Sequence, residues 1–250
     1  MNHIVGLSGG KDSTALALRL QELHPEIPFK FICTPTGDEL PEMVQHWKNL
    51  EKLLGSKLIR VTRRHTDGST MTLDSLIKMF NALPNWRQRW CTRMLKIEPT
   101  IAYIKAHQPA KLYVGLRADE EERKGIYSED VDSVFPMKDG CCEKHGPWNW
   151  GLGEVWSYLK SKNITIPIRT DCAKCYYQRI SQWKYLRRHY PKLFAAAVEL
   201  ERITGKTFRS PSKDQWPAAL KDLAKIFDSD IRMRSRLPKR EEQTCRVCQL

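Results

Sequence analysis

The 250-residue sequence predicts an α/β fold: a twisted parallel sheet of about five strands with helices on both faces, followed by a helical basic C-terminal region. Two observations carry this prediction. Short apolar runs of strand length alternate with segments in which apolar residues recur at helical spacing, and this alternation is typical of parallel sheets. From residue 181 onward, only the helical spacing remains.

The predicted strands are short runs rich in Ile, Val, Phe and Leu, bounded by glycine, proline or polar residues. They occupy residues 2–7, 28–33, 57–62 and 110–115, and a last short run at 134–136 closes the α/β part. No apolar run approaches the length that spans a membrane, and the N-terminus enters a strand at once, which predicts no signal peptide. We therefore expect no membrane association and a cytoplasmic location.

The predicted helices show apolar residues every three or four positions. Within the α/β part they cover residues 14–23, 42–52, 74–80 and 151–160, and three more follow at 181–189, 191–204 and 214–227. We therefore expect an α/β nucleotide-binding domain over residues 1–170 and a cysteine-containing, basic helical region over residues 171–250.

The stretch that organises the chain is the turn Ser8–Ser13, of sequence SGGKDS, between the first strand and the first helix. A glycine turn at a helix start brings backbone N–H groups together around an anion. Lys11 adds a charge for a polyphosphate, and Asp12 suits Mg²⁺ or the orientation of that lysine. The stretch is not a Walker A loop, because Val5 and Asp12 stand where that motif needs Gly and Ser or Thr.

The net charge of +13 is unevenly distributed. From Tyr176 to Leu250 there are 17 Lys and Arg against 8 Asp and Glu. A basic region beside a phosphate site indicates a nucleic-acid partner, DNA or RNA. The alternative is a generally basic surface without such a partner.

The Ser8–Ser13 turn resembles the pyrophosphate loop of the adenine nucleotide alpha-hydrolase superfamily. Within that superfamily, residues 1–185 resemble the phosphoadenosine phosphosulfate (PAPS) reductase family, including its DNA phosphorothioation and RNA thiolation relatives. The resemblance implies ATP with Mg²⁺, cleavage between the α and β phosphates, and transfer of AMP to a substrate. It implies nucleotide binding by the residues of the loop: Ser8, Gly9, Gly10, Lys11, Asp12 and Ser13.

Two further stretches resemble family motifs near the nucleotide. The loop after the second strand, with Thr36, Asp38 and Glu39, resembles a threonine-glycine-acidic-proline loop near the nucleotide or substrate. Carboxylates at a helix start also have a purely structural explanation. The stretch after the fourth strand resembles a motif whose arginines are here Arg117 and Arg123, and an arginine past a strand end can bind phosphate with two hydrogen bonds. The predicted catalytic residues are Lys11, Asp12, Arg117 and Arg123.

The eight cysteines are expected to be thiols, metal ligands or catalytic groups rather than disulfides. Cys172–Cys175 and Cys245–Cys248 are CxxC pairs that could close a zinc site, although the gap between them is far longer than usual. The resemblance to the family's APS reductase branch instead implies a [4Fe–4S] cluster on Cys91, Cys172 and Cys175. The third possibility is that the cysteines are reduced thiols without a metal. The fourth ligand is left open among Cys141, Cys142, Cys245 and Cys248. Cys33 is expected to be a buried apolar residue.

The intact loop and the C-terminal sequence differ from true PAPS reductases, and both differences favour ATP. We therefore expect an enzyme that adenylates a substrate, most simply nucleic acid, for sulfur transfer, with a donor such as a cysteine desulfurase. The alternatives are a PAPS or APS reductase that uses a cysteine thiolate, and a zinc-stapled nucleic-acid-binding subunit with a vestigial nucleotide site.

Overall fold

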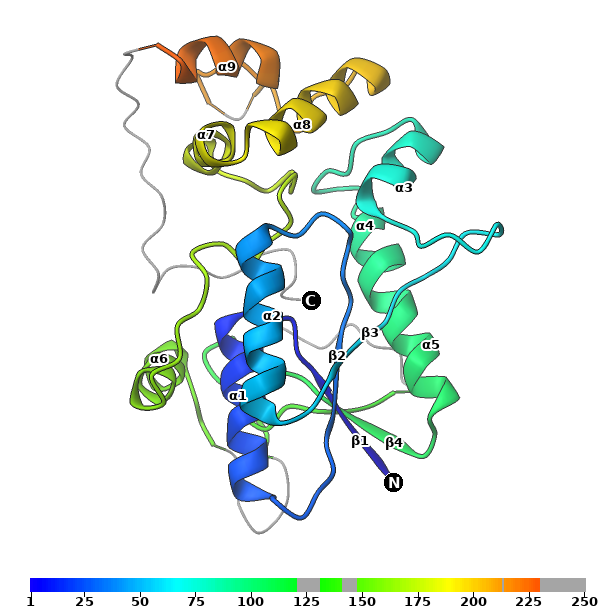
Figure 1. Cartoon of the computed structure of the whole chain (residues 1–250), viewed down its shortest axis with the longest axis vertical. Helices are drawn as coiled ribbons and strands as arrows, with labels where there is room; N and C mark the ends of the chain where they lie inside the picture. Colours follow the sequence, from blue (N-terminus) through cyan, green and yellow to red (C-terminus); the bar gives the residue numbers. More distant parts are fainter. Residues whose placement is uncertain (121–130, 141–147, 213, 230–250) are drawn as a thin grey trace.

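The computed structural model describes residues 1–120, 131–140, 148–212 and 214–229. Its centre is one parallel sheet of five strands in the order β3-β2-β1-β4-β5 (Figure 1). The strands are β1 (Asn2–Gly6), β2 (Lys30–Cys33), β3 (Leu58–Arg60), β4 (Ala110–Tyr113) and β5 (Asp132–Val134). β1 is central, because Val5 pairs with Phe31 on one side and with Tyr113 on the other. The predicted fold class is confirmed.

Helices cover both faces of this sheet. α1 (Lys11–Leu23), α2 (Pro41–Leu54) and α6 (Leu152–Ser161) share one core cluster with the first face, and α5 (Glu98–Ala106) packs on the second (Figure 1). The strands bury both faces because consecutive side chains of β1, Ile4 and Val5, point to opposite sides and are both fully buried. No helix in the described ranges is long and apolar enough to cross a membrane.

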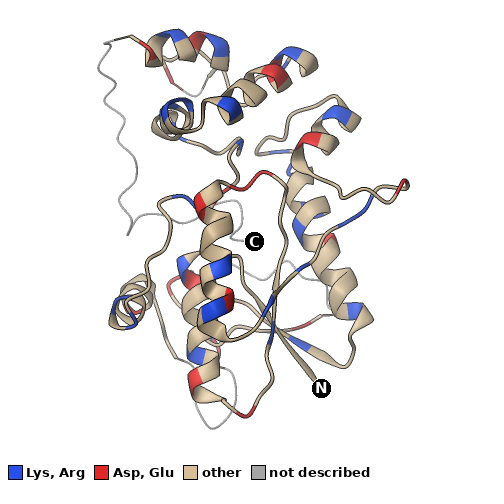
Figure 2. Ribbon diagram, in the orientation of Figure 1, with Lys and Arg blue, Asp and Glu red and all other residues tan. Residues whose placement is uncertain are grey.

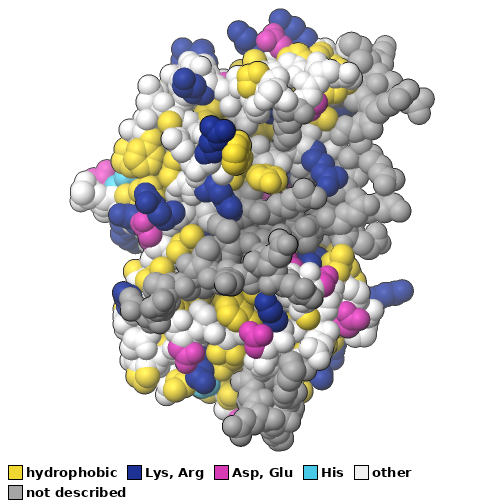
Figure 3. All heavy atoms as spheres, turned by 180° about the vertical axis from the view of Figure 1, so that it is seen from behind, with side chains coloured by type: hydrophobic (Ala, Val, Ile, Leu, Met, Phe, Trp, Pro, Cys, Tyr) yellow, Lys and Arg dark blue, Asp and Glu magenta, His cyan; other side chains and the backbone are white. Residues whose placement is uncertain are grey.

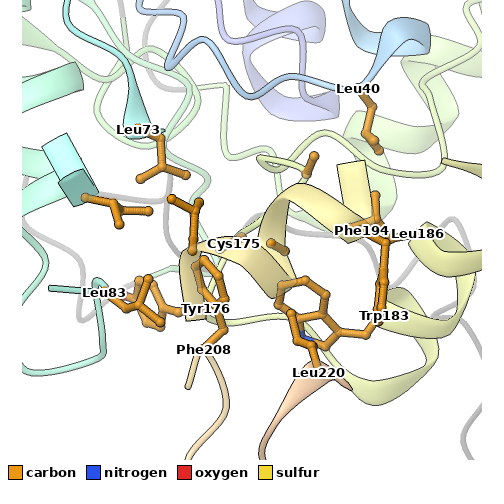
Figure 4. Close-up of a cluster of buried hydrophobic side chains, with 14 of the residues drawn as sticks. Leu40, Leu73, Leu83, Cys175, Tyr176, Trp183, Leu186, Phe194, Phe208 and Leu220 are labelled. Atoms are coloured by element: carbon orange, nitrogen blue, oxygen red, sulfur yellow. The ribbon is translucent and has the colours of Figure 1, made fainter. Parts of the chain in front are cut away.

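A second hydrophobic core lies beside the sheet domain. It is built by α3 (Leu73–Phe80), α7 (Ile180–His189), α8 (Pro191–Thr204) and α9 (Leu220–Phe227), with Trp183, Phe194 and Leu220 near its centre (Figure 4). Leu73 and Leu83, which precede residue 170, belong to the same core as the C-terminal helices. The helical region is therefore packed against part of the first 170 residues.

Several predicted elements differ from the structure. No helix was predicted where α5 lies, and β5 overlaps the predicted run at 134–136 in one residue only. The last helix begins at Leu220 rather than at residue 214, because Pro217 lacks a backbone donor and disfavours helix at the residue before it. The sequence analysis predicted no helix around Cys91, but this residue lies in the short helix α4 (Trp90–Thr92), which continues through the π-helical turn η1 (Arg93–Ile97) into α5. Met94 and Leu95 of this segment are buried, so apolar packing folds a stretch that its charges did not predict to be helical.

Glu201 of α8 forms hydrogen bonds that connect α8 to the start of α9. It is only 8% exposed, and its two carboxylate oxygens accept hydrogen bonds from the backbone N–H groups of Phe208 at 2.9 Å and Leu220 at 2.7 Å. Burial raises the pKa of Glu201 to about 7, although the two backbone donors oppose the rise.

We expect this carboxyl group to make stability depend on pH. Its folded pKa of about 7 lies above the usual 4.5, so the folded state binds more protons, and stability falls as pH rises through that window. From about pH 5 to about pH 7.5, the unfolding free energy measured in urea should drop by roughly 1–3 kcal/mol because of this group.

Glu201→Gln should flatten that dependence, while lowering stability at every pH because its amide group meets a backbone donor. The matched control is Glu199→Gln, an exposed carboxylate on the same helix that pairs with Arg202. If Glu201→Gln keeps the full pH dependence, another group causes it.

Candidate functional site

The SGGKDS loop links the carboxyl end of β1 to the first turn of α1, which begins at Lys11. Gly9 has a φ of +85°, which favours glycine. A Cβ atom there would also collide with the Met43 side chain and lie 2.8 Å from Nε1 of Trp47. Backbone conformation and space therefore both require glycine, and the loop directs the unbonded N–H groups of the first helical turn outward.

Two buried side chains of α2 contact the backbone of this loop and support its conformation. Nε1 of Trp47 donates to the carbonyl oxygen of Ser8 at 2.8 Å. His46 lies beside the backbone of Gly9, which raises the pKa of its ring, but burial outweighs this and lowers the pKa, so that the neutral ring is favoured. Both side chains are buried. The sequence did not indicate these contacts, because His46 and Trp47 lie on the apolar face of a helix like ordinary core residues.

Three charged groups meet at the head of α1. The ammonium of Lys11 lies 2.8 Å from Oδ2 of Asp12, and Nη1 of Arg117 lies 3.2 Å from both carboxylate oxygens of Asp12. Nε of Arg117 also donates to Asp119 at 2.7 Å. Asp12 therefore orients two cations, as the sequence suggested for Lys11.

The position of this cluster follows from the sheet order. β1 and β4 are neighbours, but the chain leaves them toward opposite edges of the sheet, which makes a switch point where parallel α/β sheets bind ligands. Lys11 and Arg117 are 3% and 6% exposed. Burial lowers the pKa of Lys11 and nearby Arg117 adds to this, whereas for Arg117 the surrounding carboxylates outweigh burial and raise the pKa. Two desolvated cations at a helix N-terminus form a strong site for a polyphosphate.

The Thr36–Glu39 loop after β2 uses its acidic residues to fold. Glu39 accepts hydrogen bonds from the N–H of Thr36 at 2.6 Å, from its hydroxyl at 2.7 Å and from the N–H of Gly37 at 3.1 Å. Asp38 is 4% exposed and forms a buried ion pair with Lys174. Burial raises the pKa of Asp38 to about 6, and the charge of Lys174 opposes the rise. These contacts give Glu39 and Asp38 structural roles, and their predicted role at the nucleotide stays a prediction.

The same loop docks onto the first CxxC pair. The carbonyl of Asp38 accepts from the N–H of Ala173 at 2.7 Å, and its Oδ2 accepts from the N–H of Lys174 at 2.7 Å. The hydroxyl of Thr36 lies 3.3 Å from Sγ of Cys172. Lys174 also pairs with Asp74 of α3 at 3.1 Å. The sequence analysis missed Lys174, because nothing local marks a lysine between two cysteines as a buried partner of distant carboxylates.

Cys91, Cys172 and Cys175 line one pocket, although Cys91 comes from α4 and the others from the CxxC turn. Lys96 and Lys174 lie in the same wall. The full lining is Thr36, Leu73, Pro84, Cys91, Thr92, Lys96, Asp171, Cys172, Lys174, Cys175 and Tyr176.

Thiolates are the donors that an iron–sulfur cluster or zinc requires, and the two lysines offset their charge, so the residues fit such a group chemically. Within the described part of the chain, however, no three His, Cys, Asp or Glu side chains are placed to hold a metal ion as they stand. Ligation would need the cysteines to move closer together or a further ligand from outside the described ranges.

The cysteine pocket lies next to the SGGKDS loop. A Cβ atom on Gly10 would lie 3.9 Å from Oγ1 of Thr170, and Asp171, the next residue, lines the pocket. Arg169 is 2% exposed, pairs with Asp171 at 3.2 Å and donates to the carbonyl of Cys172 at 3.1 Å. The segment 169–172 therefore connects the anion loop to the cysteines.

The remaining predicted residues divide into two groups. Cys33 is buried on β2, as expected, and burial raises the pKa of its thiol to about 12. The others lie outside the described residues: Arg123, Cys141, Cys142, Cys245 and Cys248.

A parallel sheet with an anion loop at its switch point defines this chain as an adenine nucleotide alpha-hydrolase-like α/β protein. The chain belongs to the phosphoadenosine phosphosulfate reductase domain family, whose model matches residues 2–168. It is thus a PAPS reductase-like member of the ATP pyrophosphatase superfamily.

Among curated proteins, the chain is similar to uncharacterized protein MJ0973 of Methanocaldococcus jannaschii, with 23% identity over 242 residues. The match covers 89% of this chain and 54% of that protein, so the chain spans about half the length of the curated relative.

Two solved structures are also similar in fold. The Candida auris PAPS reductase in complex with phosphate has a TM-score of 0.49 and 14% identity, over 66% of this chain and 75% of that one. The U34-tRNA thiolase NcsA of Methanococcus maripaludis with its [4Fe–4S] cluster has a TM-score of 0.41 and 15% identity, over 88% of this chain and 76% of that one.

Proposed function

We propose that this protein is an ATP pyrophosphatase that adenylates a nucleic acid for sulfur transfer and releases pyrophosphate and AMP. The observation that carries the proposal is the pair of buried cations, Lys11 and Arg117, held on Asp12 at the head of α1. These groups suit a pyrophosphate that leaves as its negative charge develops. The intact loop supports ATP over a substrate that lacks the β and γ phosphates.

The reaction has three steps. A substrate oxygen attacks the α-phosphorus of ATP, the bond to the β-phosphate breaks, and pyrophosphate leaves. A persulfide sulfur, supplied by a donor such as a cysteine desulfurase, then displaces AMP from the activated atom. A second thiol reduces the resulting S–S bond and releases the thiolated product. Mg²⁺ would accompany the phosphates, with Asp12 as the nearest carboxylate of the loop.

The charge of the chain supports nucleic acid as the substrate class. The protein carries 42 Lys and Arg against 29 Asp and Glu, and the ribbon in Figure 2 marks Lys and Arg positions in blue on the C-terminal helices and along α3 to α5. Positive side chains of this kind bind phosphates by releasing counterions, so binding should weaken as salt rises.

The test is pyrophosphate release from ATP labelled at the α-phosphate, with and without DNA or RNA. The proposal expects pyrophosphate, with labelled AMP transferred to nucleic acid or released after sulfur transfer. The family match also favours a second candidate, a PAPS or APS reductase in which a cysteine thiolate attacks sulfur. That enzyme would release sulfite from its nucleotide and no pyrophosphate from ATP, which would overturn the proposal.

The cysteine pocket supports a metal cofactor as part of this proposal. Cys91, Cys172 and Cys175 would hold a [4Fe–4S] cluster, which would supply iron for binding a sulfur species near the nucleotide. The alternative is zinc, held by the two CxxC pairs Cys172–Cys175 and Cys245–Cys248.

We expect protein purified without oxygen to be brown and to contain about four iron and four sulfide per chain if the cluster is cubane. Serine at Cys91, Cys172 or Cys175 should remove the iron and the visible absorption, because each change deletes a thiolate donor. Cys33→Ser is the matched control and should keep the iron, because Cys33 lies inside the core beneath the sheet. A colourless protein with one zinc, lost on changing Cys245 or Cys248, would contradict the cluster.

A further inference from the structure

The segment from Ser75 to Ile97 carries five cations and no acidic residue of its own, although Arg93 pairs with Glu98 at 3.4 Å. Its cations are Lys78, Arg87, Arg89, Arg93 and Lys96. Figure 3, which shows the back of the molecule, displays Lys and Arg beside hydrophobic side chains on the upper part of this face. The proposed function assigns no role to most of this segment.

Trp86 is the most exposed tryptophan of the described residues. Its side chain is 66% exposed, and the guanidinium of Arg87 lies over its ring, 4.7 Å from the centroid. By contrast, Trp47 and Trp183, which have packing roles, are 5% and 0% exposed. Core packing therefore does not explain why Trp86 is exposed to solvent with the Arg87 guanidinium against one face of its ring.

The loop that carries Trp86 has a defined shape. The side-chain oxygen of Asn85 accepts from the backbone N–H groups of Arg87 and Gln88, both at 2.9 Å. Phe80, at the end of α3, is 42% exposed, and its ring contacts Trp90 of α4 edge-on, with centroids 5.2 Å apart. The aromatic and basic side chains therefore lie on an ordered connection between two helices.

This surface leads directly to the cysteine pocket. Cys91, Thr92 and Lys96, which follow Trp86 by five to ten residues, line that pocket. A polymer held at Trp86 would thus have its neighbouring units close to the pocket and to the anion loop beside it.

We propose that Trp86 and Arg87, with Lys78 and Phe80, form a docking surface for single-stranded nucleic acid. A base would stack on the free part of the Trp86 ring, and the cations would contact phosphates. A single strand fits better than a duplex because duplex bases have no free faces, whereas loops and ends can offer one. This inference rests on the proposed function, because it names the surface that receives the proposed substrate.

The test is the binding of dye-labelled oligonucleotides to the full-length protein, followed by fluorescence anisotropy at two salt concentrations. One probe is a single strand and the other is the same sequence as a duplex. Trp86→Ala should weaken single-strand binding about 5- to 100-fold, the range that loss of one base–aromatic stack produces. Trp86→Phe should restore most of the affinity, because an aromatic face is kept.

The matched charge pair is Arg87→Ala and Arg19→Ala. Arg19 lies on α1 of the sheet domain and pairs with Glu22, so its loss should change affinity little, while Arg87→Ala should weaken binding and reduce the salt dependence. Circular dichroism and the thermal midpoint of each variant establish that it is folded.

The outcomes separate the two proposals. If the wild type binds single strands and Trp86→Ala binds equally well, the docking surface is wrong while the proposed function stands. If Trp86→Ala weakens duplex binding as much as single-strand binding, base stacking is wrong. If the wild type binds no nucleic acid even at low salt but still releases pyrophosphate, the substrate class fails and the docking surface fails with it.

Discussion

Lys11→Ala is expected to slow pyrophosphate release from ATP by about 100-fold or more, the loss typical when one fixed charge that stabilises a transition state is removed. The ammonium of Lys11 lies at the head of α1, buried and oriented by Asp12, where charge on the departing pyrophosphate would develop. The fold should survive, because Arg117 still neutralises Asp12 in the variant. The measurement is the initial rate of pyrophosphate formation at saturating Mg-ATP.

The matched control is Arg19→Ala, which removes an exposed cation from the same helix, two turns further on. It should leave the rate close to that of the wild type. Asp12→Ala should slow the reaction at least as much as Lys11→Ala, because Lys11 and Arg117 would then face each other without their shared carboxylate. Turnover by Lys11→Ala within twofold of the wild type would mean that the loop does not bind the reacting phosphates.

Lys174→Ala is expected to lower the free energy of unfolding by about 3–5 kcal/mol, because it leaves a buried charge without its partner. Asp38 and Lys174 are 4% and 3% exposed, and Asp74 pairs with the same ammonium. Loss of the lysine would leave Asp38 to take up a proton or to open the contact between the β2 loop and the CxxC turn. The measurement is urea unfolding at neutral pH.

Lys225→Ala is the control, since it removes one partner of an ion pair whose lysine is 80% exposed. Its effect should be within about 1 kcal/mol, as for other surface pairs. The double variant Asp38→Asn with Lys174→Met should be less destabilised than the sum of the two single changes, because neither buried charge then remains alone. Additive losses would show that the pair is not coupled.

The sequence supported the fold because the relevant signals are local. The alternation of strand and helix spacing predicted β1 to β4 and the helices α1, α2 and α6 of the first face. It did not predict α5 on the second face, and it placed the last strand two residues after the start of β5. The boundaries shifted where one residue overrides a pattern, as Pro217 does before α9. The segment around Cys91 was left out of the predicted helices, but Met94 and Leu95 pack against apolar residues of α3 and the C-terminal helices, and the segment is helical.

Within the candidate site, the sequence by itself determined the Ser8–Ser13 turn at the start of α1 and the position of Arg117 after β4. The loop is recognisable because strand, glycines and helix start are contiguous, and Arg117 directly follows a strand whose end must lie at the ligand-binding edge. Only the tertiary structure decided that Trp47 supports the loop, that Lys174 neutralises Asp38 and that Cys91 shares a pocket with Cys172. These residues are far apart in the chain, and a single sequence carries periodicity and local turn chemistry but does not record which distant side chains burial will pair.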